Sequence, residues 1–311
     1  MSTPPFIAMP DGVAVFAPPA APAPVLLAQP PTHGTSDAGV TGTGTGTGTA
    51  APTGDVLLVP GFTGSKEDFL AMLGPLADRG WRVAAMDLPG QNGFPGIGAR
   101  GSNTLPALAA VVADVIDWLA PDRPVHLVGH SMGGLVTREL VLSEPDRLAS
   151  WTAVCSGPGA LPPHGHAPLV ELQATLSVAP LEQIWARKEV LDRAGGWNPP
   201  SLEVAEFCAR RFIANDPIAL ADFSDILIGA PDLTEQTAAA LARTGLSATV
   251  VTGALDDAWP VSWQQEMAGR LGVPWHEIPG IGHNPNTEDP QGTAALLDGI
   301  LRAAAQGIAR P

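Results

Sequence analysis

Short runs of apolar residues alternate along this chain with longer segments in which apolar side chains recur every three or four positions. The run Val56–Val59 ends at Pro60-Gly61, and the segment Glu67–Arg79 carries the helical repeat. A short run that is apolar throughout is typical of a strand buried on both faces, whereas the repeat is typical of a helix that covers one face. This region therefore predicts a strand followed by a helix.

The same alternation continues through most of the chain. Further strands are predicted at Arg82–Met86, Val125–Val128, Ser150–Cys155, Ala248–Thr252 and Val273–Ile278. Further helices are predicted at Leu105–Leu119, Met132–Ser143 and Val261–Leu271, and from about Gln291 onward. Strands that alternate with helices indicate the α/β class, with a mostly parallel twisted sheet and helices on both of its faces.

The alternation breaks between residues 157 and 231. This stretch has no good strand, and its helix-like segments are separated by Pro, Gly and Asn. They are predicted at Leu169–Val178, Leu181–Ala194 and Leu202–Ala214. We therefore expect a helical cap, residues 157–231, inserted between the two parts of one core, residues 54–156 and 232–311.

The N-terminal residues 1–29 are expected to add a strand or hairpin to that core. Two apolar runs, Phe6–Met9 and Val13–Phe16, flank Pro10-Asp11-Gly12. Pro, Asp and Gly favour tight turns because they preset or tolerate the required backbone angles. The pattern therefore predicts that the two runs pair as a hairpin.

A low-complexity segment follows. The chain is rich in Pro and Ala from Pro18 to Pro31 and then repeats Thr-Gly from Thr41 to Thr49. Such side chains bury too little apolar surface to offset the entropy lost on ordering. Residues 30–53 are therefore predicted to be a flexible insertion.

Composition and charge exclude several classes of protein. Of 311 residues, 45% are apolar, and 16 basic residues face 31 acidic ones, a formal net charge of −15. That charge disfavours nucleic acids and anionic membranes as partners, since both attract Lys and Arg. No basic residue precedes Lys66 and no apolar run approaches the roughly 18 residues of a membrane span, so we expect a cytoplasmic location. The two cysteines cannot form a disulfide framework, and nothing in the sequence indicates the oligomeric state.

Candidate chemistry lies where predicted strands end, which is where parallel α/β sheets bind ligands. Gly129-His130-Ser131-Met132-Gly133 follows the strand Val125–Val128 and opens a helix. A serine in such a tight turn presents its hydroxyl, and small residues two positions away on each side let the chain pass close to itself. The alternative is a glycine-rich loop with an incidental serine, which the flanking strand and helix disfavour.

Two later loops carry an acid and a base. Asp256 and Asp257 follow the strand Ala248–Thr252, although one of them could simply cap the next helix. His283 lies in a glycine-rich loop after the last predicted strand. The chain order of serine, aspartate and histidine, each after a strand, is the order that the α/β-hydrolase scaffold requires.

These motifs resemble the α/β-hydrolase superfamily, and in particular the esterase-like serine hydrolases found in high-GC bacteria. The resemblance extends from about Asp55 to Ile300, and it matches the helical segment only in position and helicity. It rests on the segments Leu58–Ser65, Asp87–Gly90, Val128–Gly134, Gly253–Pro260 and Gly282–Pro290. It implies an α/β-hydrolase fold with an inserted helical cap.

The resemblance also implies roles for individual residues. Ser131 corresponds to the nucleophile and His283 to the base. Asp256 corresponds to the acid that orients the histidine, because the family places this acid three residues after a strand-terminal glycine, here Gly253. Asp257 is the alternative acid.

The backbone N–H groups of Phe62 and Met132 correspond to the oxyanion hole. Two departures from the family pattern concern the shape of the acyl pocket. Pro60-Gly61 stands where a His-Gly dipeptide is common, and Gly90–Gly93 reads Gly-Gln-Asn-Gly in place of the usual Gly-x-Gly-x-Ser. Neither departure affects the three candidate catalytic side chains.

A cap inserted at this point would cover the nucleophile. His130, Trp185 and Trp259 are therefore expected to line the substrate pocket. The aromatic residues of the cap could instead form its own core, and helical spacing favours this for Phe207 and Phe212.

Together these features predict a serine hydrolase that cleaves a small or medium apolar carboxylic ester through an acyl-serine intermediate. The same three side chains could serve a thioesterase, a carbon–carbon bond hydrolase, an acyltransferase or a cofactor-free perhydrolase, and the fold could also be a non-catalytic binding module. No cofactor is expected. His164 and His166 could ligate a metal ion, but a third ligand is missing nearby.

Overall fold

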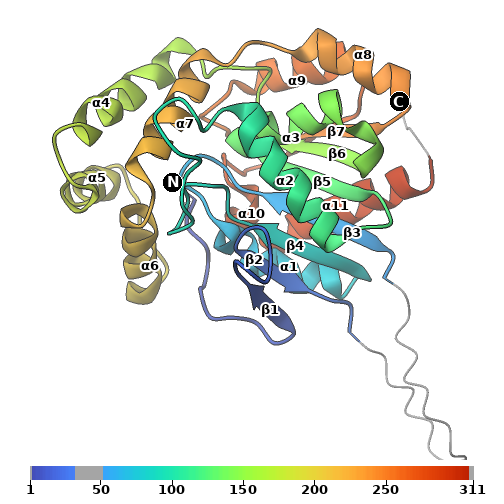
Figure 1. Ribbon diagram of the computed structural model, residues 1–311, viewed down its shortest axis with the longest axis horizontal. Helices are drawn as coiled ribbons and strands as arrows, with labels where there is room; N and C mark the ends of the chain where they lie inside the picture. Colours follow the sequence, from blue (N-terminus) through green and yellow to red (C-terminus); the bar gives the residue numbers. More distant parts are fainter. Residues whose placement is uncertain (1, 32–51, 308–311) are drawn as a thin grey trace, which may run out of the picture.

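The computed structural model describes residues 2–31 and 52–307, which fold around one twisted sheet (Figure 1). In spatial order the sheet runs β1-β2-β4-β3-β5-β6-β7-β8, with β1 and β2 antiparallel to their neighbours and the others parallel. The strands are β1 (Val13–Phe16), β2 (Val25–Ala28), β3 (Gly54–Val59), β4 (Trp81–Met86), β5 (Val125–His130), β6 (Leu148–Val154), β7 (Ser247–Gly253) and β8 (Trp275–Ile278).

Helices cover both faces of the sheet, so its central strands are apolar on both sides. Leu57 and Val59 of β3 pack into one apolar core, while Val56 and Leu58 pack into the other. The first core also includes side chains of α2 (Leu105–Leu119), α3 (Met132–Ser143), α8 (Thr234–Thr244) and α9 (Val261–Leu271). The second includes those of α1 (Leu70–Ala77) and α11 (Pro290–Ala305). The apolar runs of the sequence therefore follow from burial on two faces.

Four helices form a layer beside the core, between β6 and β7 in the chain (Figure 1). They are α4 (His166–Leu176), α5 (Leu181–Ala194), α6 (Leu202–Ile213) and α7 (Pro217–Gly229). Side chains of α5 and α6, joined by Leu220 of α7, make a small apolar core of their own. The helices lie inside residues 157–231, and the name cap is used for this range.

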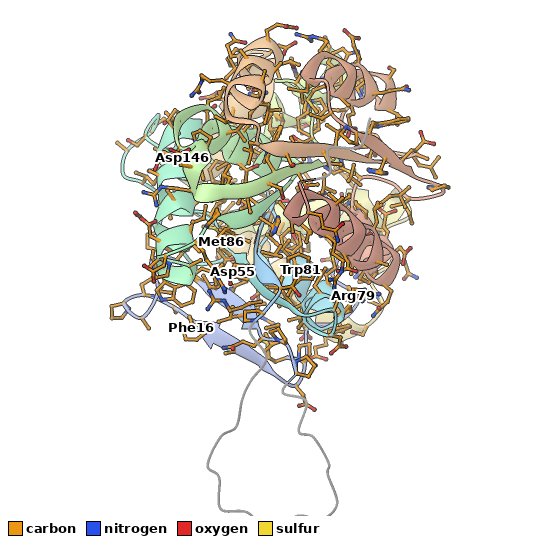
Figure 2. The ribbon with its side chains drawn as sticks, turned by 90° about the vertical axis from the view of Figure 1, so that its right-hand side faces the viewer. Phe16, Asp55, Arg79, Trp81, Met86 and Asp146 are labelled. Carbon is orange, nitrogen blue, oxygen red and sulfur yellow. The ribbon has the colours of Figure 1, made fainter. Side chains whose placement is uncertain are left out.

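Polar side chains also anchor the first residues of two central strands, Asp55 near the start of β3 and Trp81 at the start of β4 (Figure 2). The buried carboxylate of Asp55 pairs with the guanidinium groups of Arg82 and Arg123. The indole N–H of Trp81 donates to Asp298 of α11 over 2.7 Å. These contacts tie β3 to β4 and to Arg123, which precedes β5, and they tie β4 to α11.

The predicted N-terminal hairpin is wrong in its pairing. Phe6–Met9 forms no strand, and β1 instead pairs with β2, in a register that places Val13 opposite Ala28. Phe6 and Met9 are exposed, whereas β2 is buried along its whole length and bonds to β4 on its other edge. β1 therefore pairs with β2, which is buried between two strands, and the turn residues Pro10-Asp11-Gly12 do not determine its partner.

Other differences concern helices. The predicted helix Glu67–Arg79 begins as a 3₁₀ turn, η1 (Lys66–Phe69), before α1. Neither α7 nor α8 is among the helices that the sequence predicts. Short helical turns also occur at Pro145–Arg147, Pro163–Gly165 and α10 (Pro285–Glu288).

The predicted flexible insertion, residues 30–53, falls almost entirely outside the described residues. Within the described ranges, no helix combines the length and the apolar character needed to cross a membrane.

Candidate active site

Ser131 occupies a strained turn between β5 and α3. Its φ is 57° and its ψ is −126°, a conformation that side chains other than glycine seldom adopt. A Cβ on Gly129 would lie 2.4 Å from the carbonyl oxygen of Gly133, and a Cβ on Gly133 would lie 2.5 Å from that of Pro60. Both positions therefore need glycine, and the turn has the geometry that the sequence motif predicted.

The structure brings three of the predicted side chains into one hydrogen-bonded row. His283 Nε2 lies 2.9 Å from Ser131 Oγ, and His283 Nδ1 lies 2.8 Å from Asp256 Oδ1. Asp256 is buried, whereas Asp257 is exposed. Of the two candidate acids, only Asp256 contacts the histidine.

The surroundings of Asp256 favour its charged form. Burial by itself would raise the pKa of this carboxyl group, but hydrogen bonds from His283, the N–H of Ala258 and the amide of Gln264 outweigh burial and lower the pKa. An ionised Asp256 accepts a hydrogen bond from the Nδ1–H of His283, which leaves Nε2 unprotonated and able to accept the Ser131 hydroxyl proton.

Two further side chains fix the loop that carries His283. The carboxylate of Glu288 accepts the N–H of Gly282 over 2.7 Å and that of Asn284 over 2.9 Å. His130 Nε2 lies 2.8 Å from the carbonyl oxygen of His283. Burial, helped by the nearby His283, lowers the pKa of His130 to about 3, so His130 is neutral and donates its Nε2–H to that carbonyl.

The loop after β3 lies directly over the serine. A Cβ on Gly61 would be 2.8 Å from Ser131 Cβ, so only glycine lets the loop approach this closely. In the described part of the chain, no backbone hydrogen bond uses the N–H of Phe62 or of Met132. Both N–H groups flank the serine in the chain or in space, and they are the two expected at an oxyanion hole.

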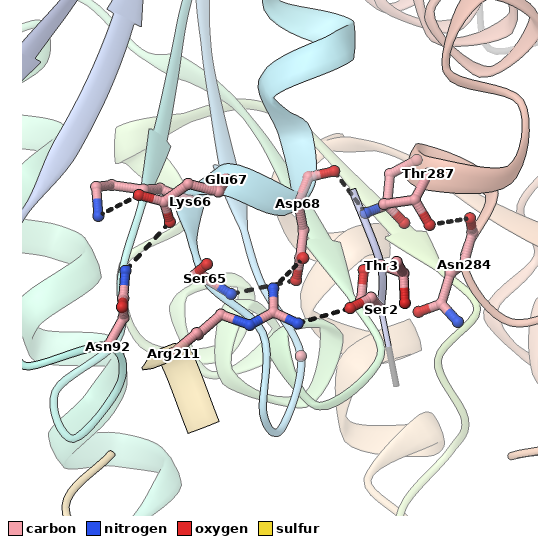
Figure 3. Close-up of polar contacts among 12 residues, drawn as sticks. Ser2, Thr3, Ser65, Lys66, Glu67, Asp68, Asn92, Arg211, Asn284 and Thr287 are labelled. Carbon is pink, nitrogen blue, oxygen red and sulfur yellow. Dashed lines mark hydrogen bonds and ion pairs between the residues drawn. The ribbon is translucent and has the colours of Figure 1, made fainter. Parts of the chain in front are cut away.

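A buried polar cluster joins this loop to the cap (Figure 3). Arg211 of α6 pairs with Asp68 Oδ1 at 2.5 Å and donates to the carbonyl oxygen of Ser2 over 2.6 Å. Asp68 Oδ2 also accepts the N–H of Ser65, and its backbone carbonyl accepts the amide of Asn286. The carboxylate of Asp68 thus joins the loop after β3 to the cap, Arg211 extends the cluster to the N-terminal segment, and the Asp68 carbonyl extends it to α10.

Ser131 and His283 line a pocket of about 210 Å³ that extends under the cap, whereas Asp256 is buried behind His283. Of the predicted lining residues, His130 and Trp259 lie in its wall. Trp185 does not, which corrects the prediction. It is buried in the core of the cap, with its ring centroid 5.5 Å from that of Phe212 and 6.0 Å from that of Trp197. An aromatic residue on an amphipathic cap helix was therefore a poor guide to the pocket.

Cys155, Asp256 and His283 are the one group of potential metal ligands found among the described residues. Burial and the nearby Asp256 raise the pKa of the Cys155 thiol well above its usual value, which opposes the thiolate form that binds metals. His283 Nδ1 already faces Asp256 in a hydrogen bond. The group therefore suits proton transfer better than metal binding.

Gln264 and Glu288 contact the site but have no role that the sequence predicts. Glu288 lies in one of the segments that carry the family resemblance, so a signal was present. Gln264 lies within α9, where a buried glutamine cannot be told from a surface one by spacing.

Comparison with known proteins shows the family of this chain. The model of the "Alpha/beta hydrolase family" matches residues 56–296, well over half of the chain. This chain belongs to the alpha/beta hydrolase family. The fold predicted from the sequence is thereby confirmed, and this hydrolase shares its fold with enzymes of known structure. A thermophilic esterase from Thermogutta terrifontis superposes with a TM-score of 0.68 at 22% identity, over 94% of this chain and 98% of that one.

Two relatives by sequence are named as a hydrolase and an esterase. The "Putative carbamate hydrolase RutD" of Variovorax paradoxus is 31% identical over 269 residues, which cover 81% of this chain and 94% of that protein. A pimeloyl acyl-carrier-protein methyl ester esterase of Aeromonas hydrophila is 36% identical over 104 residues, which cover 33% of this chain and only 38% of that protein. These similarities give the family and leave the substrate open.

Proposed function

We propose that this hydrolase is a serine esterase that cleaves a small or medium neutral carboxylic ester through an acyl-Ser131 intermediate. One observation carries the proposal. Ser131, His283 and Asp256 form an unbroken hydrogen-bonded row that opens onto a pocket. That arrangement is the one nucleophilic acyl transfer needs, since the hydroxyl, its base and the group that orients the base must be in contact before the substrate arrives.

The mechanism follows from the geometry. His283 Nε2 takes the hydroxyl proton as Ser131 Oγ attacks the ester carbonyl carbon. Asp256 holds the tautomer and stabilises the imidazolium that forms. His283 then gives the proton to the leaving alcohol, and the acyl group remains on Ser131. Water, with its proton taken by His283, releases the acid in the second half of the reaction.

The negative oxygen that develops during attack needs hydrogen-bond donors. The N–H groups of Phe62 and Met132 are assigned this role, because the first lies in the loop packed over Ser131 and the second begins α3. At a helix N-terminus the N–H groups point outward and the helix dipole favours negative charge. Removal of one such donor in related chemistry costs about 10²–10³ in rate.

The pocket favours a neutral, mainly apolar substrate. Its apolar wall includes Leu161, Leu169, Leu227 and Trp259, and none of its described lining residues is Lys or Arg. The charge of Asp68, its one carboxylate, is already paired with that of Arg211. A substrate that bears a carboxylate would find no Lys or Arg among these described residues to pair with, and its desolvation would oppose binding.

Two measurements test the proposal. A fluorophosphonate probe should label the protein and the variant Ser143→Ala, whose serine is exposed at the end of α3, but should not label Ser131→Ala. A panel of p-nitrophenyl esters of increasing acyl length, an acyl-CoA thioester, a carbamate ester and a vinylogous diketone should show the highest kcat/KM for a short or medium ester. Labelling of Ser131→Ala would remove the assignment of the nucleophile. A preference for the thioester, the carbamate or the diketone would replace the ester with that class.

A further inference from the structure

We propose that Gln264 is a positioning residue for catalysis, and that a hydrogen-bond chain from the partly buried Trp275 through the buried Thr252 fixes which end of its amide faces Asp256. The inference rests on the proposed function, because Gln264 acts through the carboxylate that orients His283. It adds Gln264, Thr252 and Trp275 to the residues that support Ser131, His283 and Asp256.

Every polar atom of the Gln264 side chain has a partner. Its Nε2 donates to Asp256 Oδ2 over 2.8 Å and to the carbonyl oxygen of Trp259 over 3.1 Å, so both of its N–H bonds are used. Its Oε1 accepts the hydroxyl of Thr252 over 2.9 Å. Gln264 and Thr252 are both fully buried, so water does not compete for these contacts.

The indole of Trp275 sets the direction of the chain. Its Nε1 lies 3.2 Å from Thr252 Oγ1, and an indole N–H can only donate. Thr252 therefore accepts from Trp275 and gives its own hydrogen to Gln264 Oε1. This places the NH₂ group of Gln264 toward Asp256. The reversed amide would set Oε1 against Oδ2, two buried acceptors without a proton between them, which is strongly unfavourable.

The chain matters for catalysis because it completes the solvation of the acid. Asp256 Oδ1 already accepts from His283 Nδ1 and from the N–H of Ala258. Oδ2 receives the amide of Gln264, and the side chain of Asp256 is buried, so loss of this donor would leave Oδ2 without its amide partner in a place shielded from water. Two well-placed donors on Oδ1 and one on Oδ2 hold the carboxylate plane in the orientation that meets His283.

Gln264 also connects the acid to the wall of the pocket. The carbonyl oxygen that it binds belongs to Trp259, whose ring centroid lies 6.2 Å from that of His283. The indole of Trp259 donates to the carbonyl oxygens of Gly159 and Ala160 at the entrance to the cap. Gln264 therefore holds the acid and the pocket wall in one fixed arrangement.

Three other ionisable groups lie close to the Asp256–His283 pair and could contribute to the pH dependence of kcat. The Cys155 thiol from the end of β6 faces Asp256, and burial raises its pKa. His130 from β5 faces the backbone of His283, and burial lowers its pKa to about 3. Glu288 of α10 binds the N–H groups on either side of His283. All three groups remain unchanged in the variants below.

The experiment compares Gln264→Leu, Thr252→Val and Thr252→Ser, with kcat and KM measured against pH on one activated neutral ester. Gln264→Leu should lower kcat by about 10- to 100-fold, the range expected for a hydrogen bond to a charged group, with KM changed less than about twofold. With a donor to the carboxylate lost, Asp256 and His283 together should hold a proton more tightly. The acidic limb of kcat/KM should therefore move to higher pH.

The threonine pair separates positioning from packing. Thr252→Val keeps the shape but loses the hydroxyl, so the amide of Gln264 is no longer held in one orientation and kcat should fall with the same pH shift, to a smaller extent. Thr252→Ser keeps the hydroxyl and should restore both kcat and the pH profile to near wild type. The double variant Gln264→Leu/Thr252→Val should be no worse than Gln264→Leu alone, because Thr252 acts only through Gln264.

Two results would overturn the inference. One is a Gln264→Leu enzyme with unchanged kcat and pH profile, and the other is Thr252→Val and Thr252→Ser behaving alike. If Gln264→Leu does not fold, as judged by thermal unfolding, the threonine pair decides alone. Failure of the proposed function would give a different result. Ser131→Ala would then turn over the ester as fast as the wild-type enzyme does, whatever the Gln264 variants do.

Discussion

At the scale of single residues, neighbouring aspartates at the end of β7 have opposite surroundings. Asp256 N–H donates to the carbonyl oxygen of Gly253, and this turn brings its side chain back toward His283. Asp257, one position further, is exposed to solvent. Position in a turn thus gives one carboxylate a histidine partner and leaves the other solvated.

We predict that Asp256→Asn lowers kcat by several orders of magnitude, up to about 10⁴-fold, because an amide no longer selects the required histidine tautomer. Asp257→Asn should cost less than about tenfold and serves as the matched control. Steady-state kcat on one activated ester, measured for both variants, decides between them. A crippled Asp257→Asn enzyme with a normal Asp256→Asn enzyme would reverse the assignment of the acid.

At the scale of elements, α6 is attached to the core by a buried ion pair. Arg211 and Asp68 are almost fully buried, and Arg211 also binds the backbone of Ser2. Removing one member of a buried pair leaves an uncompensated charge in a place that water cannot reach. The adjacent Arg210 offers a contrast. Its exposed side chain pairs with the exposed Glu206, and the nitrogen and oxygen atoms of this pair are 3.7 Å apart.

Arg211→Met should therefore lower the free energy of unfolding by about 3–5 kcal/mol. Arg210→Met should change it by less than about 1 kcal/mol, as surface ion pairs do. Urea unfolding of both variants, followed by fluorescence, measures the difference. Equal destabilisation by the two substitutions would show that the Asp68 contact does not anchor the cap.

At the scale of the whole molecule, the net charge of −15 acts over distances longer than any contact. A field of one sign repels ions of the same sign as they approach, and salt screens this effect. A neutral substrate does not feel it.

We predict that added salt raises kcat/KM for an ester that carries a carboxylate and leaves that of its neutral methyl analogue unchanged. Raising NaCl from about 10 mM to about 150 mM shortens the screening length from about 30 Å to about 8 Å, which removes most of the repulsion. Initial rates at low substrate concentration give both values. A rise that is equal for the two esters would point to a salt effect on the enzyme itself.

The sequence by itself determined the alternating core and the positions of its reactive loops. Several helices, among them α2, α3 and α9, begin and end at the predicted residues, because strand and helix periods depend on which side chains face the core. The glycines around Ser131 were equally informative, since close approach of the backbone permits no Cβ. Local constraints of this kind can be recognised in the sequence, because they restrict which residue types can stand at each position.

Only the tertiary structure decided which distant residues meet. It paired β1 with β2, placed Trp185 in the core of the cap and Trp259 in the pocket wall, and joined Gln264 to Asp256. Each of these outcomes depends on burial by a partner far away in the chain, and no local period records that partner. A buried glutamine has the same sequence signature as an exposed one, and its function becomes visible only when its hydrogen-bond partners are in place.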